Sequence, residues 1–249
     1  MHPLLFVRGD GVAEIYILGF NGSPRKYGNT FKMLKMALLA AEREGARTRL
    51  FHLYDYNIKP CLGCLVDDQK ACRYPCVIED DMKEIYREIL DADGIIIATP
   101  IYWYNVSGVL KNFIDRITVF ENMINIEGRS WVEGKVAGVI AAGNDSGCIS
   151  VISNLYAVLN SMGFAIPPWA LAYKNNMLPL KSEKERLLDA ANIGRCVALM
   201  AKLLKNGPEK WYSVDLAKWM EEIYPLVEEE AEENWRRQEP ERRRIIKRR

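Results

Sequence analysis

The sequence predicts an α/β fold built around a parallel β-sheet, with a helical appendage toward its C-terminal end. Short apolar runs rich in β-branched residues alternate with amphipathic helical patterns, which is typical of parallel sheets. Three polar loops follow predicted strands, and ligands of such folds gather at the carboxyl ends of the strands. A length of 249 residues with 49% hydrophobic content suits one large α/β domain with its own core.

Predicted strands and helices alternate along the first hundred residues. A strand is predicted at 15–20, where the residues are Ile-Tyr-Ile-Leu-Gly-Phe. A polar loop leads from it to an amphipathic helix at 30–44. Further strands are predicted at 48–53 and 94–99, with a helix at 80–90 between them.

The helix predicted at 106–120 has the clearest periodicity. Its apolar residues recur at i, i+3, i+4 and i+7 and predict a buried stripe of Leu110, Phe113, Ile114 and Ile117. Lys111 and Asp115 predict an i,i+4 ion pair on another face of the same helix.

The remaining elements complete the alternation. A strand is predicted at 136–141, a helix at 149–162, a weaker strand at 165–172 and a helix at 183–205. Five strands with intervening helices predict a flavodoxin-like three-layer sandwich around a five-stranded parallel sheet.

The chain is expected to divide into three parts. Residues 1–13 form an N-terminal extension, residues 14–206 the flavodoxin-like domain, and residues 207–249 a helical extension with a basic tail. Within the last part, an aromatic and acidic helix is expected to break at Pro225 and to pack on the body or on a second subunit. The basic end could touch nucleic acid or an anionic surface, but a frayed, solvated tail is expected.

Charge and hydropathy restrict the partners. A formal net charge of +1 gives no global reason to bind nucleic acid. No apolar run approaches the roughly 20 residues that cross a bilayer, and the apolar stretch at 3–7 is too short for a signal peptide. A cytoplasmic protein without a membrane or nucleic-acid partner is therefore expected.

The loop after the first strand predicts an anion site. It reads Asn-Gly-Ser-Pro-Arg-Lys-Tyr-Gly-Asn-Thr over residues 21–30. A strand, a small polar loop and the start of a helix point backbone N–H groups at one spot, which usually binds phosphate. The side chains that add donors or charge are Ser23, Arg25 or Lys26, Asn29 and Thr30.

The composition of this loop restricts the phosphate that it suits. A Walker A loop needs Lys before its Ser or Thr, whereas Gly28 and Asn29 precede Thr30, so a nucleoside triphosphate fits poorly. Gly19, Gly22 and Gly28 lack the spacing of a dinucleotide fingerprint. A single phosphate monoester, such as FMN carries, remains. The alternative is an ordinary surface turn before a helix capped by Asn29 or Thr30.

Two further loops offer a surface for the isoalloxazine ring of FMN. The loop at 99–105 follows the third strand and presents the adjacent aromatic residues Tyr102, Trp103 and Tyr104. The loop at 142–147 follows the fourth strand, and its glycines let backbone approach the ring closely. Three loops at one edge of the sheet therefore predict one FMN site. Core filling is the alternative role of the three aromatic residues.

No catalytic acid or base is predicted. The chain has two histidines, His2 and His52, and the second lies in a strand pattern that favours a structural role. Hydride transfer from a nicotinamide to a flavin depends on proximity and stacking more than on a proton-transfer residue. The sequence therefore favours a flavin enzyme over a hydrolase with a Ser-His-Asp triad.

Several spaced motifs together resemble one family. They are the loop at 21–30, Cys61-Leu-Gly-Cys64, Cys76-Val-Ile-Glu-Asp-Asp-Met82, and the segment from Thr99-Pro-Ile-Tyr-Trp to Lys111-Asn-Phe-Ile-Asp-Arg116. Over roughly residues 14–205 the chain resembles the NADPH-dependent FMN reductase family, and within it the iron-sulfur flavoprotein-like branch.

This resemblance implies FMN at the three loops and a homodimer or homotetramer. It also implies, position by position, which residues hold the cofactor. The phosphate would be held by Ser23, Arg25, Gly28, Asn29 and Thr30. The ring would be lined by Pro100, Ile101, Tyr102, Trp103, Asn105, Ala142, Gly143 and Gly147.

Four of the six cysteines lie within sixteen residues, and their spacing departs from that family. The iron-sulfur flavoproteins that the chain resembles carry C-x-x-C-x-x-C and a later fourth cysteine, whereas Asp67 stands at the third position here. The spacing is C-x2-C-x7-C-x3-C, formed by Cys61, Cys64, Cys72 and Cys76. Four thiolates could bind a [4Fe–4S] cluster or Zn²⁺. Free thiols or disulfides are the third alternative.

The leading functional hypothesis is an FMN-dependent oxidoreductase. NADH, NADPH or ferredoxin would reduce FMN, which would pass electrons to a small acceptor such as a quinone or free flavin. Tyr102 and Trp103 would shape the acceptor pocket. A non-enzymatic flavodoxin-like or iron-sulfur electron carrier is the first alternative, and a phosphate-binding α/β protein without flavin is a weaker one.

Overall fold

A computed structural model describes residues 14–208 and 210–247, so the extension expected at 1–13 lies outside the described residues. The sheet has five parallel strands in the order β2-β1-β3-β4-β5. The strands are β1 (Ile15–Asn21), β2 (Ala46–His52), β3 (Gly94–Pro100), β4 (Val136–Gly143) and β5 (Leu171–Asn175). This is the flavodoxin-like order, which reverses between β1 and β3 and confirms the predicted fold class.

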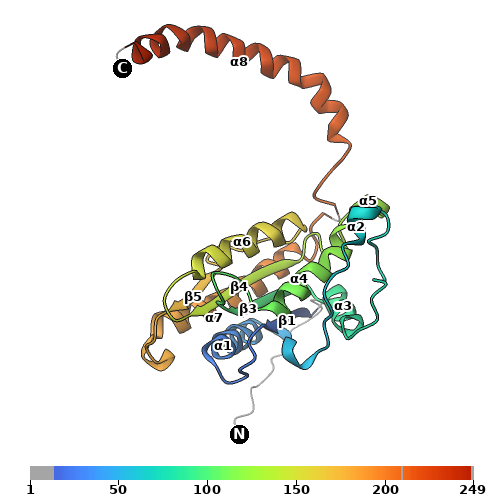
Figure 1. Ribbon diagram of the computed structural model, residues 1–249, viewed down its shortest axis with the longest axis vertical. Coiled ribbons are helices and arrows are strands. Elements are labelled where there is room, and N and C mark those ends of the chain that lie inside the picture. Colours follow the sequence, from blue (N-terminus) through green and yellow to red (C-terminus); the bar gives the residue numbers. More distant parts are fainter. Residues whose placement is uncertain (1–13, 209, 248–249) are drawn as a thin grey trace. The chain divides into compact units, whose positions relative to one another are not determined.

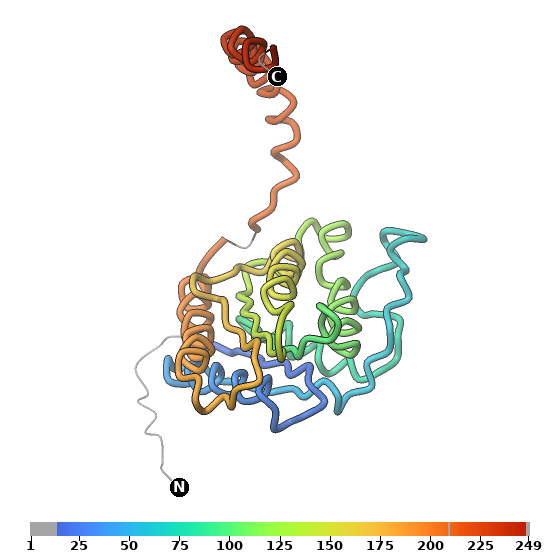
Figure 2. Tube along the Cα trace, turned by 60° about the vertical axis from the view of Figure 1, so that its left-hand side comes forward, coloured from blue at the N-terminus to red at the C-terminus, as the bar shows by residue number. Residues whose placement is uncertain are grey.

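Helices cover both faces of this sheet (Figure 1). They are α1 (Asn29–Arg43), α2 (Cys64–Asp67), α3 (Met82–Asp91), α4 (Gly108–Glu121), α5 (Ile124–Glu127), α6 (Cys148–Ser161), α7 (Lys184–Leu204) and α8 (Leu216–Ile246). Two 3₁₀ turns lie at Leu53–Asp55 and Leu180–Ser182. Helices α1 and α7 lie side by side on one face, as Figure 2 shows, while α3, α4 and α6 cover the other.

The sheet separates two apolar cores. Leu18 and Phe20 of β1 face the core under α3, α4 and α6, whereas Ile15 and Ile17 face the core under α1 and α7. This follows from the alternation of side chains along a strand. On the second face the two helices touch closely, because a Cβ at Gly194 would lie 1.8 Å from the carbonyl oxygen of Ala37.

The weaker strand predicted at 165–172 is displaced. Only Ala165 makes an isolated bridge there, to Val136, and β5 begins at Leu171. The reason lies between these positions, where two prolines lack the N–H that a ladder needs and Trp169 has a positive φ of 58°. Similarly, the helix predicted from 106 begins at Gly108, because Ser107 is still extended, with ψ of 152°.

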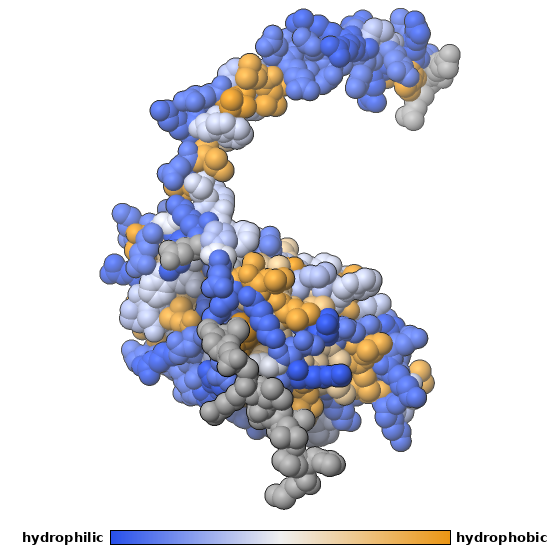
Figure 3. All heavy atoms as spheres, turned by 180° about the vertical axis from the view of Figure 1, so that it is seen from behind, coloured by the Kyte–Doolittle hydropathy of each residue, from blue (hydrophilic) through white to orange (hydrophobic). Residues whose placement is uncertain are grey.

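The chain divides into two compact units after Trp211. The described part of the second unit contains α8, which has no buried residue and carries apolar patches between polar stretches (Figure 3). The break predicted at Pro225 is wrong, because α8 continues through both Pro225 and Pro240. Each proline removes one backbone donor, and the strong helix formers that surround it keep the flanking turns helical.

None of the helices in the part of the chain that the structure describes has an apolar stretch long enough to span a membrane.

Candidate functional site

The loops that follow β1, β3 and β4 meet at the carboxyl edge of the sheet. The Ser107 hydroxyl, just before α4, donates to the carbonyl of Gly22 in the loop after β1 at 2.6 Å. The Ser146 hydroxyl in the loop after β4 donates to the hydroxyl of Tyr104 in the loop after β3 at 3.2 Å. Side-chain contacts therefore join three loops that are far apart in the sequence into one site.

The start of α1 has the properties of an anion site. Its N-cap is Gly28, which has extended backbone and no side-chain cap. The predicted alternative, a helix capped by Asn29 or Thr30, is therefore wrong, and both residues belong to the first helical turn. Because helix N-termini carry unpaired N–H groups and a partial positive charge, this turn can bind phosphate.

Polar side chains beside this turn hold the loop in shape. Ser23 and Thr30 are each 4% exposed, and the Ser23 hydroxyl accepts a hydrogen bond from the backbone N–H of Arg25 at 3.2 Å. Lys26 pairs with Asp55 at 2.6 Å, whereas Arg25 has no ion pair within the described ranges. Of the two basic residues expected to add charge, Arg25 is thus the one left for a ligand.

The loop after β3 forms a tight turn that presents its aromatic residues to solvent. Two backbone hydrogen bonds of 3.0 Å join Tyr102 and Asn105, and the residues between them have positive φ values of 50° and 61°. Tyr102, Trp103 and Tyr104 are 40%, 96% and 66% exposed, so the alternative that they fill the core is wrong. Bulky residues rarely adopt positive φ, and such strain collects at functional sites.

The loop after β4 packs directly against this turn. The backbone N–H of Ile101 donates to the carbonyl of Ala142 at 3.0 Å. A Cβ at Gly147, whose φ is +88°, would lie 3.0 Å from the ring of Tyr104, and one at Gly143 would lie 3.2 Å from Ile101. Glycine at both positions therefore lets the two loops touch. Pro100, the last residue of β3, is buried beneath them.

Asn21, His52 and Tyr54 support the site although the sequence assigned none of them a role in binding. The carboxamide oxygen of Asn21 accepts from the Ser23 N–H at 3.1 Å, and its nitrogen lies 2.9 Å from Nδ1 of His52. His52 thus has the structural role expected of it, and burial lowers its pKa. Burial, and to a smaller extent the nearby Tyr102, raises the pKa of Tyr54. Its position after the end of β2 was the available signal, because that strand ends at the same edge.

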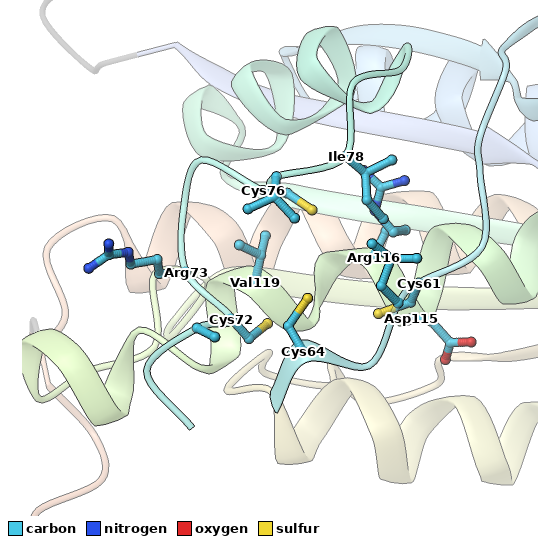
Figure 4. A pocket seen from close by; sticks show the side chains of 12 residues that line it. Cys61, Cys64, Cys72, Arg73, Cys76, Ile78, Asp115, Arg116 and Val119 are labelled. Carbon is cyan, nitrogen blue, oxygen red and sulfur yellow. The ribbon is translucent and has the colours of Figure 1, made fainter. Parts of the chain in front are cut away.

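The four clustered cysteines line one pocket beside α4. Figure 4 shows the sulfur atoms of Cys61, Cys64, Cys72 and Cys76 turned toward a shared space. All are free thiols, and Cys61 is exposed whereas the others are half-buried. Among the residues that the structure describes, no three His, Cys, Asp or Glu side chains form a group ready for a single metal ion.

The thiols of this pocket interact electrostatically. Burial raises the pKa of the Cys72 thiol to about 11, and the nearby Cys61, Cys76 and Cys64 raise it in the same direction. Negative charge on one sulfur therefore disfavours negative charge on its neighbours. A cation held among the four would remove this penalty, because metal ligation deprotonates thiols.

Hydrogen bonds hold the segment that carries the cysteines, residues 59–80, at both ends and in its middle. Arg116 of α4 donates to the carbonyl of Lys59 at 3.0 Å and to both carboxylate oxygens of Asp80 at 2.5 and 3.1 Å. The Lys59 N–H donates to the same carboxylate at 2.9 Å. Farther along α4, the Asn122 carboxamide donates to the carbonyl of Cys72 at 2.7 Å. The pocket thus has a fixed frame around its thiols.

Helix α4 connects the two sites. Its N-cap, Ser107, ends the loop after β3. Asp115, Arg116 and Val119 from the middle of the helix line the cysteine pocket. Nine residues at 1.5 Å per residue separate Ser107 from Arg116 by about 14 Å along the helix axis.

Known proteins resemble this chain over most of its length. The family model described as NADPH-dependent FMN reductase matches residues 15–176. An iron-sulfur flavoprotein of Methanocaldococcus jannaschii is 31% identical over 196 residues, which are 76% of this chain and 99% of the relative.

Solved structures agree on the fold. The crystal structure of RosB with bound 8-demethyl-8-formylriboflavin-5'-phosphate matches with a TM-score of 0.68 at 21% identity, covering 85% of this chain and 87% of RosB. A flavodoxin from the domain Archaea matches with a TM-score of 0.51 at 13% identity, covering 76% of this chain and 99% of the flavodoxin.

Proposed function

The chain belongs to the NADPH-dependent FMN reductase family, and from this premise we propose that it is an FMN-dependent oxidoreductase. NADH, NADPH or reduced ferredoxin donates the electrons, and a small acceptor such as a quinone or free flavin receives them. The observation that carries the proposal is the hydrogen bond from Ser107 to Gly22. It joins the loop after β1, here called the phosphate loop, to the loop after β3, here called the ring loop. A ligand with both a phosphate and a flat ring fits that junction.

The phosphate of FMN fits the start of α1. The uncapped first turn supplies N–H donors, and the buried Ser23 and Thr30 supply hydroxyl groups. Arg25 supplies a charge that no carboxylate among the described residues neutralises. Gly28 and Asn29 complete the set of residues proposed to hold the phosphate.

The ring of FMN fits the loops after β3 and β4. Tyr102 and Trp103 offer exposed aromatic surface, and Gly143 and Gly147 let the loop after β4 pack closely against the loop that carries them. Pro100, Ile101, Asn105 and Ala142 support that surface. When bound, FMN supplies the hydride and electron chemistry. Helix α6 starts at Cys148, and its N-cap Gly147 supplies no side-chain cap, so its N-terminus favours negative charge on the ring.

The four cysteines are proposed to hold a [4Fe–4S] cluster. Their shared pocket, their mutual effect on pKa and the iron-sulfur flavoprotein name of the Methanocaldococcus jannaschii relative support this assignment. Cys61, Cys64, Cys72 and Cys76 would each provide one thiolate. Zinc in the same pocket is the alternative.

A homo-oligomer remains part of the proposal. Trp103 and Trp169 are 96% and 84% exposed. Large aromatic residues are enriched in interfaces, so a partner subunit would cover them favourably.

Anaerobic steady-state kinetics test the proposed activity. Oxidation of NADPH or NADH is followed with a quinone acceptor, and in parallel with reduced ferredoxin as donor. Turnover that requires FMN is the expected result. Thr30→Val keeps the shape of the side chain but removes a hydroxyl, so we expect weaker FMN binding than in the exposed α1 variant Leu39→Ala.

Two outcomes would replace the proposal. A protein that retains FMN but turns over no donor would be an electron carrier. A colourless protein that takes up no added FMN would be a phosphate-binding α/β protein without flavin.

A further inference from the structure

Helix α4 buries an arginine with one side-chain nitrogen that has no hydrogen-bond partner among the described residues. Arg116 is 2% exposed, and its Nε is buried without a hydrogen-bond partner in the described structure. Its two terminal nitrogens are occupied, because both bind Asp80 and one also binds the carbonyl of Lys59. A buried N–H without a partner is unfavourable, so a group that accepts from it is expected.

The cysteine pocket lies beside this side chain. Arg116 lines the pocket together with all four clustered cysteines (Figure 4). The carboxylate of Asp80 accepts hydrogen bonds from the two terminal nitrogens of the guanidinium. The Nε–H therefore takes no part in this ion pair. Asp80 is itself fixed, because it accepts from the backbone N–H groups of Lys59 at 2.9 Å and Met82 at 3.1 Å.

We propose that Arg116 donates its Nε–H to the anionic iron-sulfur group held by the four cysteines and thereby raises the reduction potential of that group. The inference rests on the proposed function, which assigns a [4Fe–4S] cluster to this pocket. Arg116 is then a residue that tunes the cluster rather than a ligand of it.

The sign of the effect follows from charge. Reduction adds one electron, supplied by the flavin or by an external one-electron donor, and neither makes nor breaks a bond at the cluster. The reduced cluster is one unit more negative, so a guanidinium and an N–H···S bond stabilise it more than the oxidised cluster. Hydrogen bonds to sulfur and net charge are known controls of iron-sulfur potentials. Arginine stays charged at any working pH.

Matched arginine variants test the proposal. The anaerobically reconstituted protein is assayed for iron and sulfide, and its midpoint potential is measured by spectroelectrochemistry. Arg116→Lys keeps the charge but removes the Nε donor, so the potential is expected to fall. Arg116→Gln removes both the charge and the Nε donor, so the potential is expected to fall further. At a fixed applied potential the oxidised-to-reduced ratio of the cluster should rise at least tenfold, which corresponds to 59 mV for a one-electron couple.

Arg73 provides the control. It lines the same pocket, but it is exposed and its guanidinium points away from the sulfur atoms (Figure 4). Arg73→Lys and Arg73→Gln are expected to leave the potential near that of the wild type. Equal potentials in wild type and both Arg116 variants, at full iron content, would overturn the proposal.

A wild-type measurement covers the case in which Arg116 variants lose the cluster. With ¹⁵N-labelled arginine in an Arg73→Lys background, pulsed EPR of the reduced cluster is expected to detect a weakly coupled nitrogen. No coupling would overturn the proposal. A protein that takes up no iron and sulfide would overturn it as well, while retained FMN and turnover in that protein would leave the flavin function standing.

Discussion

The Ser107 hydroxyl donates a 2.6 Å hydrogen bond to the carbonyl of Gly22, and this contact joins two loops that are 85 residues apart. Ser107 also precedes α4, and its own N–H lies 3.4 Å from the Thr99 hydroxyl at the end of β3. One buried residue, through its hydroxyl and its backbone N–H, thus fixes the loops after β1 and β3 and the start of α4 relative to one another.

Ser107→Ala is expected to lower both stability and FMN affinity. The substitution leaves a buried carbonyl without its donor, which costs about 1–3 kcal/mol. Because the two loops lose their link, the dissociation constant for FMN is expected to rise several-fold. Urea unfolding and titration of flavin fluorescence measure the two effects. Ser161→Ala at the exposed end of α6 serves as control, and equal values for both variants would contradict the account.

Gly147→Ala is expected to weaken FMN binding through a clash as well as through strain. Gly147 has a φ of +88°, and a Cβ there would lie 3.0 Å from the Tyr104 ring. Gly45→Ala is the matched control, because its φ is +86° but its Cβ would meet nothing within 4 Å. Both variants should lose stability, since alanine disfavours positive φ. Only Gly147→Ala should lose FMN affinity, and an equal loss in both would show that the contact is irrelevant.

Asp80→Ala is expected to lower the free energy of unfolding at pH 7 by about 3–5 kcal/mol, because it leaves Arg116 buried without its counter-charge. Burial alone would raise the pKa of Asp80, but hydrogen bonds from Arg116 and from the N–H groups of Lys59 and Met82 lower it overall.

A carboxylate whose pKa is depressed on folding stabilises the protein above its unfolded pKa and loses that effect as pH falls through the folded value. Urea titrations from pH 7 toward pH 3 should therefore show a shallower decline in Asp80→Ala than in the wild type. Asp91→Ala, at the exposed end of α3, should keep the decline of the wild type. Parallel declines in all three proteins would contradict this role of Asp80.

Removal of bound metal is expected to expose a poorly reactive thiol. In chelator-treated protein, the rate of Cys72 alkylation should rise with pH around a midpoint near 11, because burial and the neighbouring thiols raise its pKa. Replacing Cys61, Cys64 and Cys76 with serine removes part of that effect, so the midpoint should move down. Mass spectrometry of iodoacetamide-treated protein measures both. A midpoint that is unchanged in the triple variant would mean that the four thiols do not interact.

The sheet could be predicted from the sequence because its strands are nearly uniform apolar runs. Parallel strands buried on both faces must be apolar throughout, and β1 and β3 are fully buried. Edge strand β5 is partly exposed, so its pattern is weaker and its start was misplaced. The helix break expected at Pro225 was wrong for a different reason, because proline weakens a helix without always ending it.

The candidate site could be predicted where function resides in a contiguous loop. The loops at 21–30, 99–105 and 142–147 each carry a local signal, and the strand order brings them together. Contacts between distant residues carry no such signal. The position of Tyr54 after β2 places it at this edge, but its approach to Tyr102 and the unpartnered Nε of Arg116 beside the cysteines depend on packing that no spacing in the sequence encodes.

The proposal that this chain binds both FMN and an iron-sulfur cluster is tested by the visible spectrum of protein purified without oxygen, together with its FMN, iron and sulfide content. The account predicts one FMN per chain, with paired flavin bands and an added broad shoulder that bleaches on reduction. Flavin bands alone would restrict the protein to an FMN reductase-like enzyme. A spectrum with bands from neither cofactor, even after added FMN and anaerobic reconstitution, would contradict the account.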